Sequence, residues 1–452
     1  MVAACLVFYA SFGTTNLVFL LAIVAIAWLT GAGLAASRTA AGRAALLSIG
    51  LILILGSLFA LKFYDFLAGE LERIAGFGLP RLGLTAPVGF SFYAFMAAAY
   101  VIDAWRGAAV SAAAPLQVGL YLSWFPKILA GPIERAPDFL RQIPGRLRFH
   151  PLLAVVGLQL ILLGLVKKVV IADNLAPVVD SAFRIAAYAA PMELVVAIYF
   201  FAFQIYCDFS GYSDIAIGLS LLFGIRLMEN FRRPYLSVST AEFWSSRWHI
   251  SLGHWFRDYL YVPLGGSRAG ALRRYANVMA VFLVSGLWHA GLGYGVGWTF
   301  LVWGALNGAY QWAGLATRGL WRGLAQALPV IAASRLWRVV RILVVFHLIL
   351  LSWVFFRAAT IDQAFTVLRR VWTALPTLPS LVTTYPFSAD HKLGALLIVG
   401  LVAFELLDER RSIMRRLAAA PRAIRWGVWY AAIFALVLLG RWGSGQFIYM
   451  QF

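Results

Sequence analysis

Apolar stretches close to the length of a membrane crossing recur from one end of this 452-residue chain to the other. Hydrophobic residues make up 62% of the chain and charged residues 13%, with a mean hydropathy of +0.81, whereas soluble domains carry roughly 25% charged residues. The stretches predict an all-α, polytopic membrane protein of about 10–11 spanning helices, with one or two short re-entrant or amphipathic helices. They are residues 17–36, 45–61, 152–166, 194–209, 297–311, 342–356, 393–407 and 426–439.

Basic residues account for the net charge of +19 and fall between the apolar stretches. This distribution is typical of cytoplasmic loops that face anionic lipid headgroups, so membrane lipid is an expected partner and nucleic acid is not. No long hydrophilic linker interrupts the pattern, which predicts one integral-membrane domain over residues 1–452. The two cysteines, Cys5 and Cys207, predict small buried side chains rather than a disulfide or a metal site. The basic clusters are residues 141–148, 167–168, 232–233, 268–274, 335–341 and 410–425.

One histidine, His289 in the segment SGLWHA, lies at the end of the apolar run from Tyr275 to Ala290. An imidazole titrates near neutral pH and can accept or donate a proton, and an ionisable group at membrane depth indicates function by default. The alternative is a core histidine whose ring is satisfied by one backbone carbonyl. If Arg273 and Arg274 mark the cytoplasmic edge, His289 lies fifteen residues further along a helix. That is roughly 22 Å into a hydrocarbon core of about 30 Å, where the ring could serve two substrates that arrive from opposite sides.

The polar residues concentrate in one block, residues 204–274. Asp208 and Asp214 interrupt an apolar helix, and their spacing of six residues puts them roughly 120° apart, so they need not share a face. Such carboxylates pair with a cation or a backbone donor inside a bundle, or they take part in chemistry. The segment that follows is too polar for a span and too apolar for a solvated loop, which predicts a short amphipathic or re-entrant piece. In it, His249 and His254 are five residues apart, so they are not i, i+4 metal ligands, and no metal site is expected.

Nine segments, in order along the chain, make it similar to a known family. It resembles the membrane-bound O-acyltransferase superfamily and, within it, the alginate O-acetyltransferase branch. The match covers nearly the whole chain. The segments are PVGFSFYAFMAAAYVIDAWRG (87–107), FPKILAGPIERAPDF (125–139), GLVKKVVIADNLAPVV (164–179), QIYCDFSGYSDIAIGL (204–219), ENFRRPYL (229–236), RWHISLGHWFRDYLYVPLGG (247–266), SGLWHA (285–290), SWVFFRA (352–358) and FIYMQF (447–452).

The resemblance implies a ring of helices around a thin central region pierced by a funnel. It implies that His289, in the WH motif, is catalytic and that His249, in RWHISL, is the second family histidine. It also implies a cytoplasmic donor such as acetyl-CoA or another acyl thioester or acyl carrier, no bound cofactor, and location in a bacterial inner membrane. Relatives act with periplasmic acetyltransferases that have a Ser-His-Asp arrangement, which this sequence itself does not show. Such a partner, or a polysaccharide-export protein, is therefore expected.

The resemblance leaves the roles of the individual side chains open. His289 is either a general base on an acceptor hydroxyl or a transient acyl carrier, and His249 either assists the donor or is structural. Aromatic neighbours pack more often than they bind substrate, and guanidinium groups suit the phosphates of a donor as well as lipid headgroups. The candidate substrate-binding residues are Trp248, Trp288, Asp208, Asn230, Arg232 and Arg247.

The chain also departs from the family pattern. Ala290 follows His289 where the family usually has glycine, and Asn307 stands where the family has a later histidine. The stretch 291–297 is longer and richer in glycine than the usual link to the next helix. The family generally has one more apolar helix before the segment that matches residues 5–13.

The sequence therefore predicts an enzyme that moves an acetyl group towards hydroxyls of an exported polysaccharide or its periplasmic acceptor. Among enzymes, the alternative is acylation of a teichoic-acid-like polymer, a lipid or a small molecule. Outside enzymes, the alternative is a non-catalytic transporter of the acyl donor, and the lack of an internal sequence repeat argues against it.

Overall fold

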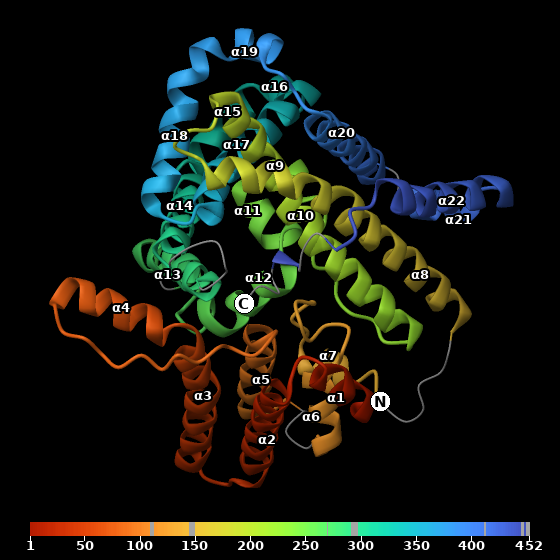
Figure 1. The fold of residues 1–452 in the computed structure, drawn as a ribbon. Helices are drawn as coiled ribbons and strands as arrows, with labels where there is room; N and C mark the ends of the chain where they lie inside the picture. Colours follow the sequence, from red (N-terminus) through yellow and green to blue (C-terminus); the bar gives the residue numbers. More distant parts are fainter. Residues whose placement is uncertain are drawn as a thin grey trace.

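The computed structural model describes residues 1–108, 113–143, 150–268, 270–290, 297–410, 413–443 and 447–448. Throughout these residues the regular structure is helical, which confirms the predicted all-α class. Figure 1 shows a group of N-terminal helices in its lower half, a long helix pair that crosses the centre, and further helices above and to the right.

The helices follow one another in four groups along the chain. The N-terminal group is α1 (Val2–Ala10), α2 (Thr14–Ala36), α3 (Ala40–Lys62), α4 (Tyr64–Ala75), α5 (Phe90–Trp105), α6 (Pro115–Ser123) and α7 (Ala136–Leu140). The central group is α8 (Pro151–Leu165), the π-helical turn η2 (Val166–Ala172), α9 (Asp173–Arg184) and α10 (Pro191–Leu222). The third group is the 3₁₀ turn η3 (Pro234–Leu236), α11 (Thr240–Glu242), the π-helical turn η4 (Phe243–Arg247), α12 (Ile250–Phe256), the π-helical turn η5 (Arg257–Tyr261), α13 (Ala271–His289) and α14 (Trp298–Ala316). The last group is α15 (Arg318–Ala327), α16 (Pro329–Ala332), α17 (Arg335–Arg357), α18 (Ile361–Ala374), the 3₁₀ turn η6 (Leu375–Thr377), α19 (Leu378–Thr384), α20 (Ala389–Arg410), α21 (Ile413–Ala419) and α22 (Arg422–Leu439).

Six helices among the described residues are long and apolar enough to cross a membrane. The chain is therefore a multi-pass membrane protein, as predicted, with fewer such helices than the ten or eleven expected from the apolar stretches. The difference arises because other stretches form shorter or more polar helices: α5 has only 16 residues, and α20 carries charged residues at both ends. The six are Thr14–Ala36, Ala40–Lys62, Pro151–Arg184, Pro191–Leu222, Arg335–Arg357 and Arg422–Leu439.

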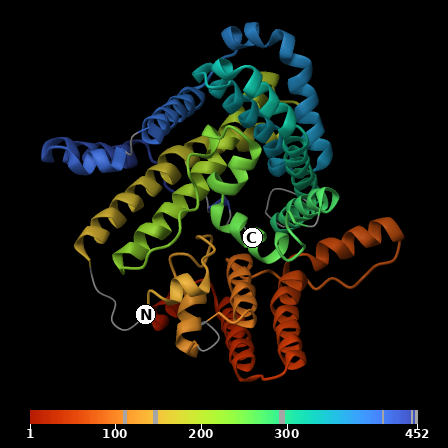
Figure 2. The ribbon, with the colours of Figure 1, turned by 180° about the vertical axis from the view of Figure 1, so that it is seen from behind.

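Two glycine pairs bring the backbones of α8 and α10 close together. A Cβ placed on Gly164 would lie 2.5 Å from the carbonyl oxygen of Gly211, and one on Gly157 would lie 2.6 Å from that of Gly218. Small residues at a helix interface allow such close approach inside a membrane. The two helices run side by side across the centre of the molecule (Figure 2). This contact fixes α10, from which the site's supporting side chains project.

We expect Gly164→Ala to destabilise the protein by about 1–3 kcal/mol, because the added methyl group meets the backbone of α10 and cannot be relieved by a side-chain rotation. The control is Gly56→Ala on α3, where nothing lies within 4 Å of an added Cβ. There the higher helix propensity of alanine should leave stability unchanged or slightly higher. Thermal melts of the two variants in the same detergent compare these effects, and equal melting temperatures would contradict the glycine contact.

The lysines of η2 are buried and ion-paired, so the sequence-based placement of residues 167–168 in a cytoplasmic loop is wrong. Lys167 Nζ lies 2.7 Å from Asp214 Oδ2. Lys168 Nζ lies 2.7 Å from Asp208 Oδ1 and 2.9 Å from Asp173 Oδ1. The widened π-helical turn lets two consecutive lysines reach carboxylates six residues apart on α10. The carboxylates compensate the cost of burying the two cations.

Candidate active site

The segment between α10 and α13 folds into short helices and π-helical turns around a cavity, which confirms the predicted amphipathic or re-entrant piece. The cavity has a volume of about 310 Å³ and is also lined by α13 and α14. Its lining is mainly apolar and aromatic, with a few polar groups at defined places, which is the usual character of a small-molecule site. The lining residues are Ala241, Trp244, Ser245, Trp248, His249, Leu252, Gly253, Phe256, Arg257, Tyr261, Arg274, Val278, Val281, Phe282, Ser285, His289, Gln311 and Leu315.

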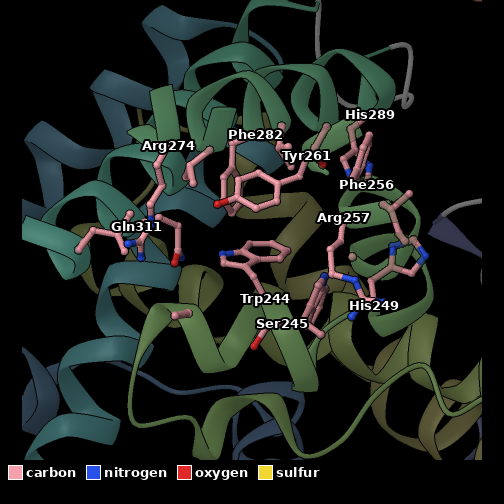
Figure 3. Close-up of a pocket in the computed structure, with 18 residues that line it drawn as sticks. Trp244, Ser245, His249, Phe256, Arg257, Tyr261, Arg274, Phe282, His289 and Gln311 are labelled. Carbon is pink, nitrogen blue, oxygen red and sulfur yellow. The ribbon is translucent and has the colours of Figure 1, made fainter. Parts of the chain in front are cut away.

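One face of α13 forms a continuous wall of this cavity. Arg274, Val278, Phe282, Ser285 and His289 recur at intervals of three or four residues, so they lie on the same side of the helix. His289 lies fifteen residues beyond Arg274 along this wall, or roughly 22 Å. Figure 3 shows Arg274 at one end of the cavity and His289 at the other. A basic end and a histidine end are therefore joined by one apolar passage.

His289 is the last residue of α13 and is buried among aromatic rings. Its ring centroid lies 4.8 Å from that of Trp288, 5.2 Å from that of Trp303 and 5.3 Å from that of Phe356. The indole of Trp303 comes from α14 and the phenyl ring of Phe356 from α17, so three helices fix the imidazole. Trp288 itself is absent from the cavity lining and packs behind the histidine, which fits the packing alternative for this residue.

His249 lies on the same cavity, in a strained conformation. It precedes α12 with φ 42° and ψ 53°, the left-handed region that non-glycine residues rarely adopt. Its ring packs 4.7 Å from that of Phe209 on α10. His249 Nε2 is buried and hydrogen-bonds none of the described residues. The two predicted histidines therefore line one cavity on the side away from Arg274 (Figure 3), and a buried ring nitrogen of His249 is open to a ligand.

Asn230 holds the backbone that follows His249. Its backbone carbonyl accepts a hydrogen bond from Ile250 N at 3.0 Å. Its side-chain Oδ1 accepts from Ser251 N at 3.2 Å and from Ser251 Oγ at 2.9 Å, while Nδ2 donates to Ser213 Oγ at 3.1 Å. Asn230 is 1% exposed and does not line the cavity. Asn230 therefore supports the turn that carries His249.

Three charged candidates also lie outside the cavity lining. Asp208 pairs with Lys168 and accepts a hydrogen bond from Ile448 N at 2.8 Å. Arg247 is 8% exposed and pairs with Glu242 and Glu409, whereas Arg232 pairs at the surface with Glu229. Substrate binding by these residues and by Asn230 stays a prediction, and Trp248 is the one candidate of the substrate-binding set that lines the cavity.

Trp244 occupies the middle of the cavity and was missed by the sequence-based reasoning (Figure 3). Its indole Nε1 donates to Asn307 Oδ1 at 3.0 Å, and Asn307 Nδ2 in turn donates to Trp303 O at 2.9 Å. The asparagine that stands where the family has a later histidine therefore anchors a lining tryptophan. The residues Arg257, Ser285 and Gln311 were also missed, although the helical spacing of polar residues before His289 could have indicated Ser285.

A Ser–His–Glu chain does occur, away from this cavity. Ser388 Oγ lies 2.6 Å from His391 Nδ1, and His391 Nε2 lies 3.0 Å from Glu193 Oε2. Ser388 immediately precedes α20, and its Oγ also accepts from the backbone N–H of His391. These contacts are those of a side-chain cap on the first turn of a helix, with Glu193 tying that turn to α10. The stretch 291–296 and residues 449–452 of the last family segment lie outside the described residues.

Comparisons with known proteins identify the family of this chain. A family model described as membrane-bound O-acyltransferase matches residues 106–356. The chain is 34% identical over 386 residues to a probable alginate O-acetylase AlgI of Azotobacter vinelandii, covering 83% of this chain and 72% of the relative. A probable alginate O-acetylase AlgI of Pseudomonas aeruginosa is 37% identical, covering 74% of this chain and 61% of the relative. A peptidoglycan O-acetyltransferase of Helicobacter pylori is 33% identical, covering 82% of this chain and 72% of the relative.

The family match spans both histidines and every lining residue of the cavity. Together with the relatives, which are 33–37% identical to the chain, it confirms the family resemblance seen in the sequence and shows that the chain is an enzyme. The chain belongs to the membrane-bound O-acyltransferase family and is an O-acyltransferase.

Proposed function

We propose that this enzyme takes an acetyl group from cytoplasmic acetyl-CoA and passes it towards hydroxyls of an exported polysaccharide, or of its periplasmic acceptor, at a bacterial inner membrane. The observation that carries the proposal is the passage along α13, which joins a basic end at Arg274 to the buried His289. An elongated thioester fits such a passage, because its charged part can stay at the basic end while its acyl carbon reaches the imidazole.

The basic end suits a phosphorylated donor. Arg274 lines the cavity there with Gln311 beside it, and Arg257 lines the cavity on the side of His249 (Figure 3). Guanidinium groups bind phosphate oxygens in a bidentate manner. Arg257 also pairs with Asp258 at 2.7 Å while its side chain is 57% exposed, so it can exchange that partner for a donor phosphate at little cost.

His289 serves best as a general base. Its ring nitrogen takes the proton of an acceptor hydroxyl while the oxygen forms a bond to the thioester carbonyl carbon. The tetrahedral intermediate then breaks its carbon–sulfur bond, and the imidazolium returns the proton to the departing thiolate. The products are an acetyl ester and free CoA, and His289 returns to its neutral form. In the alternative, the ring carries the acyl group transiently.

The relatives support a glycan hydroxyl as the acceptor. Two of them are named for alginate and one for peptidoglycan, which are both polymers outside the cytoplasmic membrane. The multi-pass architecture suits a reaction whose donor and acceptor lie on opposite sides. A periplasmic acetyltransferase or a polysaccharide-export protein is the proposed partner that receives or delivers the group.

Filling the passage tests the proposal. Val281 lines the cavity on α13, whereas Val284 on the same helix is 40% exposed and lines none of it. We expect Val281→Trp to raise the KM for acetyl-CoA roughly tenfold, because the indole occupies the donor's space, and Val284→Trp to leave it unchanged. The measurement is transfer of radiolabelled acetyl groups by the purified protein to a glycan acceptor.

The same assay separates the alternatives. Equal KM values in the two tryptophan variants would show that the donor does not use the passage. Transfer to a lipid or a small hydroxyl compound, with none to a glycan, would replace the proposed acceptor. Passage of the intact donor across proteoliposomes, with no acetyl ester formed, would identify a transporter.

A further inference from the structure

Lys62 lies directly beside the catalytic end of α13, although it belongs to the N-terminal group of helices. It is the last residue of α3. Its ammonium Nζ donates to the backbone carbonyl of Trp288 at 2.8 Å and to Ser91 Oγ, near the start of α5, at 3.2 Å. Nζ also lies 5.4 Å from the centroid of the Trp288 ring. A carbonyl oxygen, a hydroxyl and an aromatic face are all partners that favour an ammonium ion.

The contacted carbonyl stabilises the position of His289. The last four carbonyl groups of a helix lack intrahelical partners, and that of Trp288 is one of them because α13 ends at His289. A cation at this end also interacts favourably with the helix dipole. Lys62 therefore holds the turn that carries the imidazole, from a helix more than two hundred residues away in the chain.

The same ammonium acts on the charge of His289. Burial of the imidazole is the largest influence that disfavours its protonated form, and His249 from the start of α12 and Lys62 from α3 act in the same direction. The rings that α14 and α17 present to it are the uncharged ones of Trp303 and Phe356. Arg274 lines the opposite end of the cavity, whereas Arg257 lines it on the side of His249 (Figure 3). A positive charge beside an imidazole disfavours its protonated form.

We propose that Lys62 is a positioning residue of the acyl-transfer site, which fixes the last turn of α13 and keeps His289 in the neutral form that can act as a base. This inference rests on the proposed function for its link to catalysis, but its electrostatic part concerns the free protein. It assigns a role in the reaction to the C-terminal end of α3, which lies outside the matched residues 106–356.

The test measures how the neutral fraction of His289 depends on pH. Diethyl pyrocarbonate modifies neutral imidazole, so its rate of reaction at His289, followed by mass spectrometry, reports that fraction without any acyl transfer. Transfer of acetyl groups from acetyl-CoA is measured over the same pH range. The neutral variants are Lys62→Met, which removes the hydrogen bond as well as the charge, and Lys62→Gln, which keeps a donor. Lys62→Arg keeps the charge, and Lys392→Met on α20 is a control for loss of an exposed lysine.

Both neutral variants should move the pH of half-maximal modification upward by about one unit, because the imidazole is more easily protonated once the cation is gone. Lys62→Arg and Lys392→Met should leave it where the wild type has it. A half-maximal pH that does not move in a folded Lys62→Gln or Lys62→Met protein overturns the inference, whatever the transferase activity. If the pH of half-maximal modification is unchanged and acetyl transfer is lost at every pH, Lys62 contributes only to packing and the inference is likewise wrong. Absence of acetyl transfer by the wild type would instead count against the proposed function, because the modification arm is read independently.

Discussion

Replacing His289 with alanine is expected to lower the kcat of acyl transfer by roughly 10²–10⁴-fold, the ordinary contribution of a positioned general base. The loss should appear in kcat rather than in the KM for acetyl-CoA, since the proposed site for the donor's charged part is at the other end of the cavity. His289→Gln tests the same point with less empty space among the rings of Trp303 and Phe356. The measurement is acetyl transfer by the purified protein, with a thermal melt to establish that each variant is folded.

Two other histidines provide the comparison. His254 does not line the cavity, and His254→Ala should retain wild-type activity. His249→Ala should have an intermediate effect, because its ring faces the cavity while the proposed proton transfer is assigned to His289. Full activity of a folded His289→Ala protein would show that His289 is a structural core residue and not a catalytic one. An equal loss in all three variants would point to a general effect on folding rather than to chemistry.

Replacing Lys168 with methionine is expected to destabilise the protein by about 3–5 kcal/mol, the usual cost of leaving buried charges without their partner. Lys168 compensates two carboxylates at once, those of Asp208 and Asp173, which are 1% and 8% exposed. Asp208 also accepts the backbone N–H of Ile448, so the loss should loosen the C-terminal segment as well. Denaturant or thermal unfolding in detergent measures the change in the free energy of unfolding.

The double variant Lys168→Met/Asp208→Asn should recover part of the lost stability, because it removes one of the charges left unpaired. The matched control is Arg141→Met, since Arg141 and its partner Asp138 are 75% and 58% exposed, and an exposed pair contributes little. Equal destabilisation by Lys168→Met and Arg141→Met would contradict the importance of burial at this triad.

The cavity explains why the sequence indicated some site residues and not others. His289 stood out because an ionisable residue at the end of an apolar run is costly, and His249 followed from the family motif. Trp244 and Gln311 carry no such signal, since tryptophan and glutamine occur commonly in helices of this kind. Their place in the cavity depends on how α11, η4 and α14 pack against α13.

Arg247 and Lys168 show the opposite error, in which residues with a strong sequence signal have an unexpected environment. A basic residue between apolar stretches is ordinarily at the membrane surface. Arg247 is instead buried against Glu242 and Glu409, and Lys168 against Asp208 and Asp173. Arg247 and Glu409 are 162 residues apart in the chain, so the sequence around either residue gives no indication that they pair.

The sequence by itself determined the all-α class, the membrane location, the family and the identity of His289 as the candidate base. Hydropathy and motif order are properties of neighbouring residues, so they can be read without the fold. Only the tertiary structure decided which charges neutralise one another, that His249 and His289 face a single cavity, and that Lys62 contacts the end of α13. Those outcomes depend on contacts between helices far apart in the chain, and the free energy of such contacts arises only once the helices have packed.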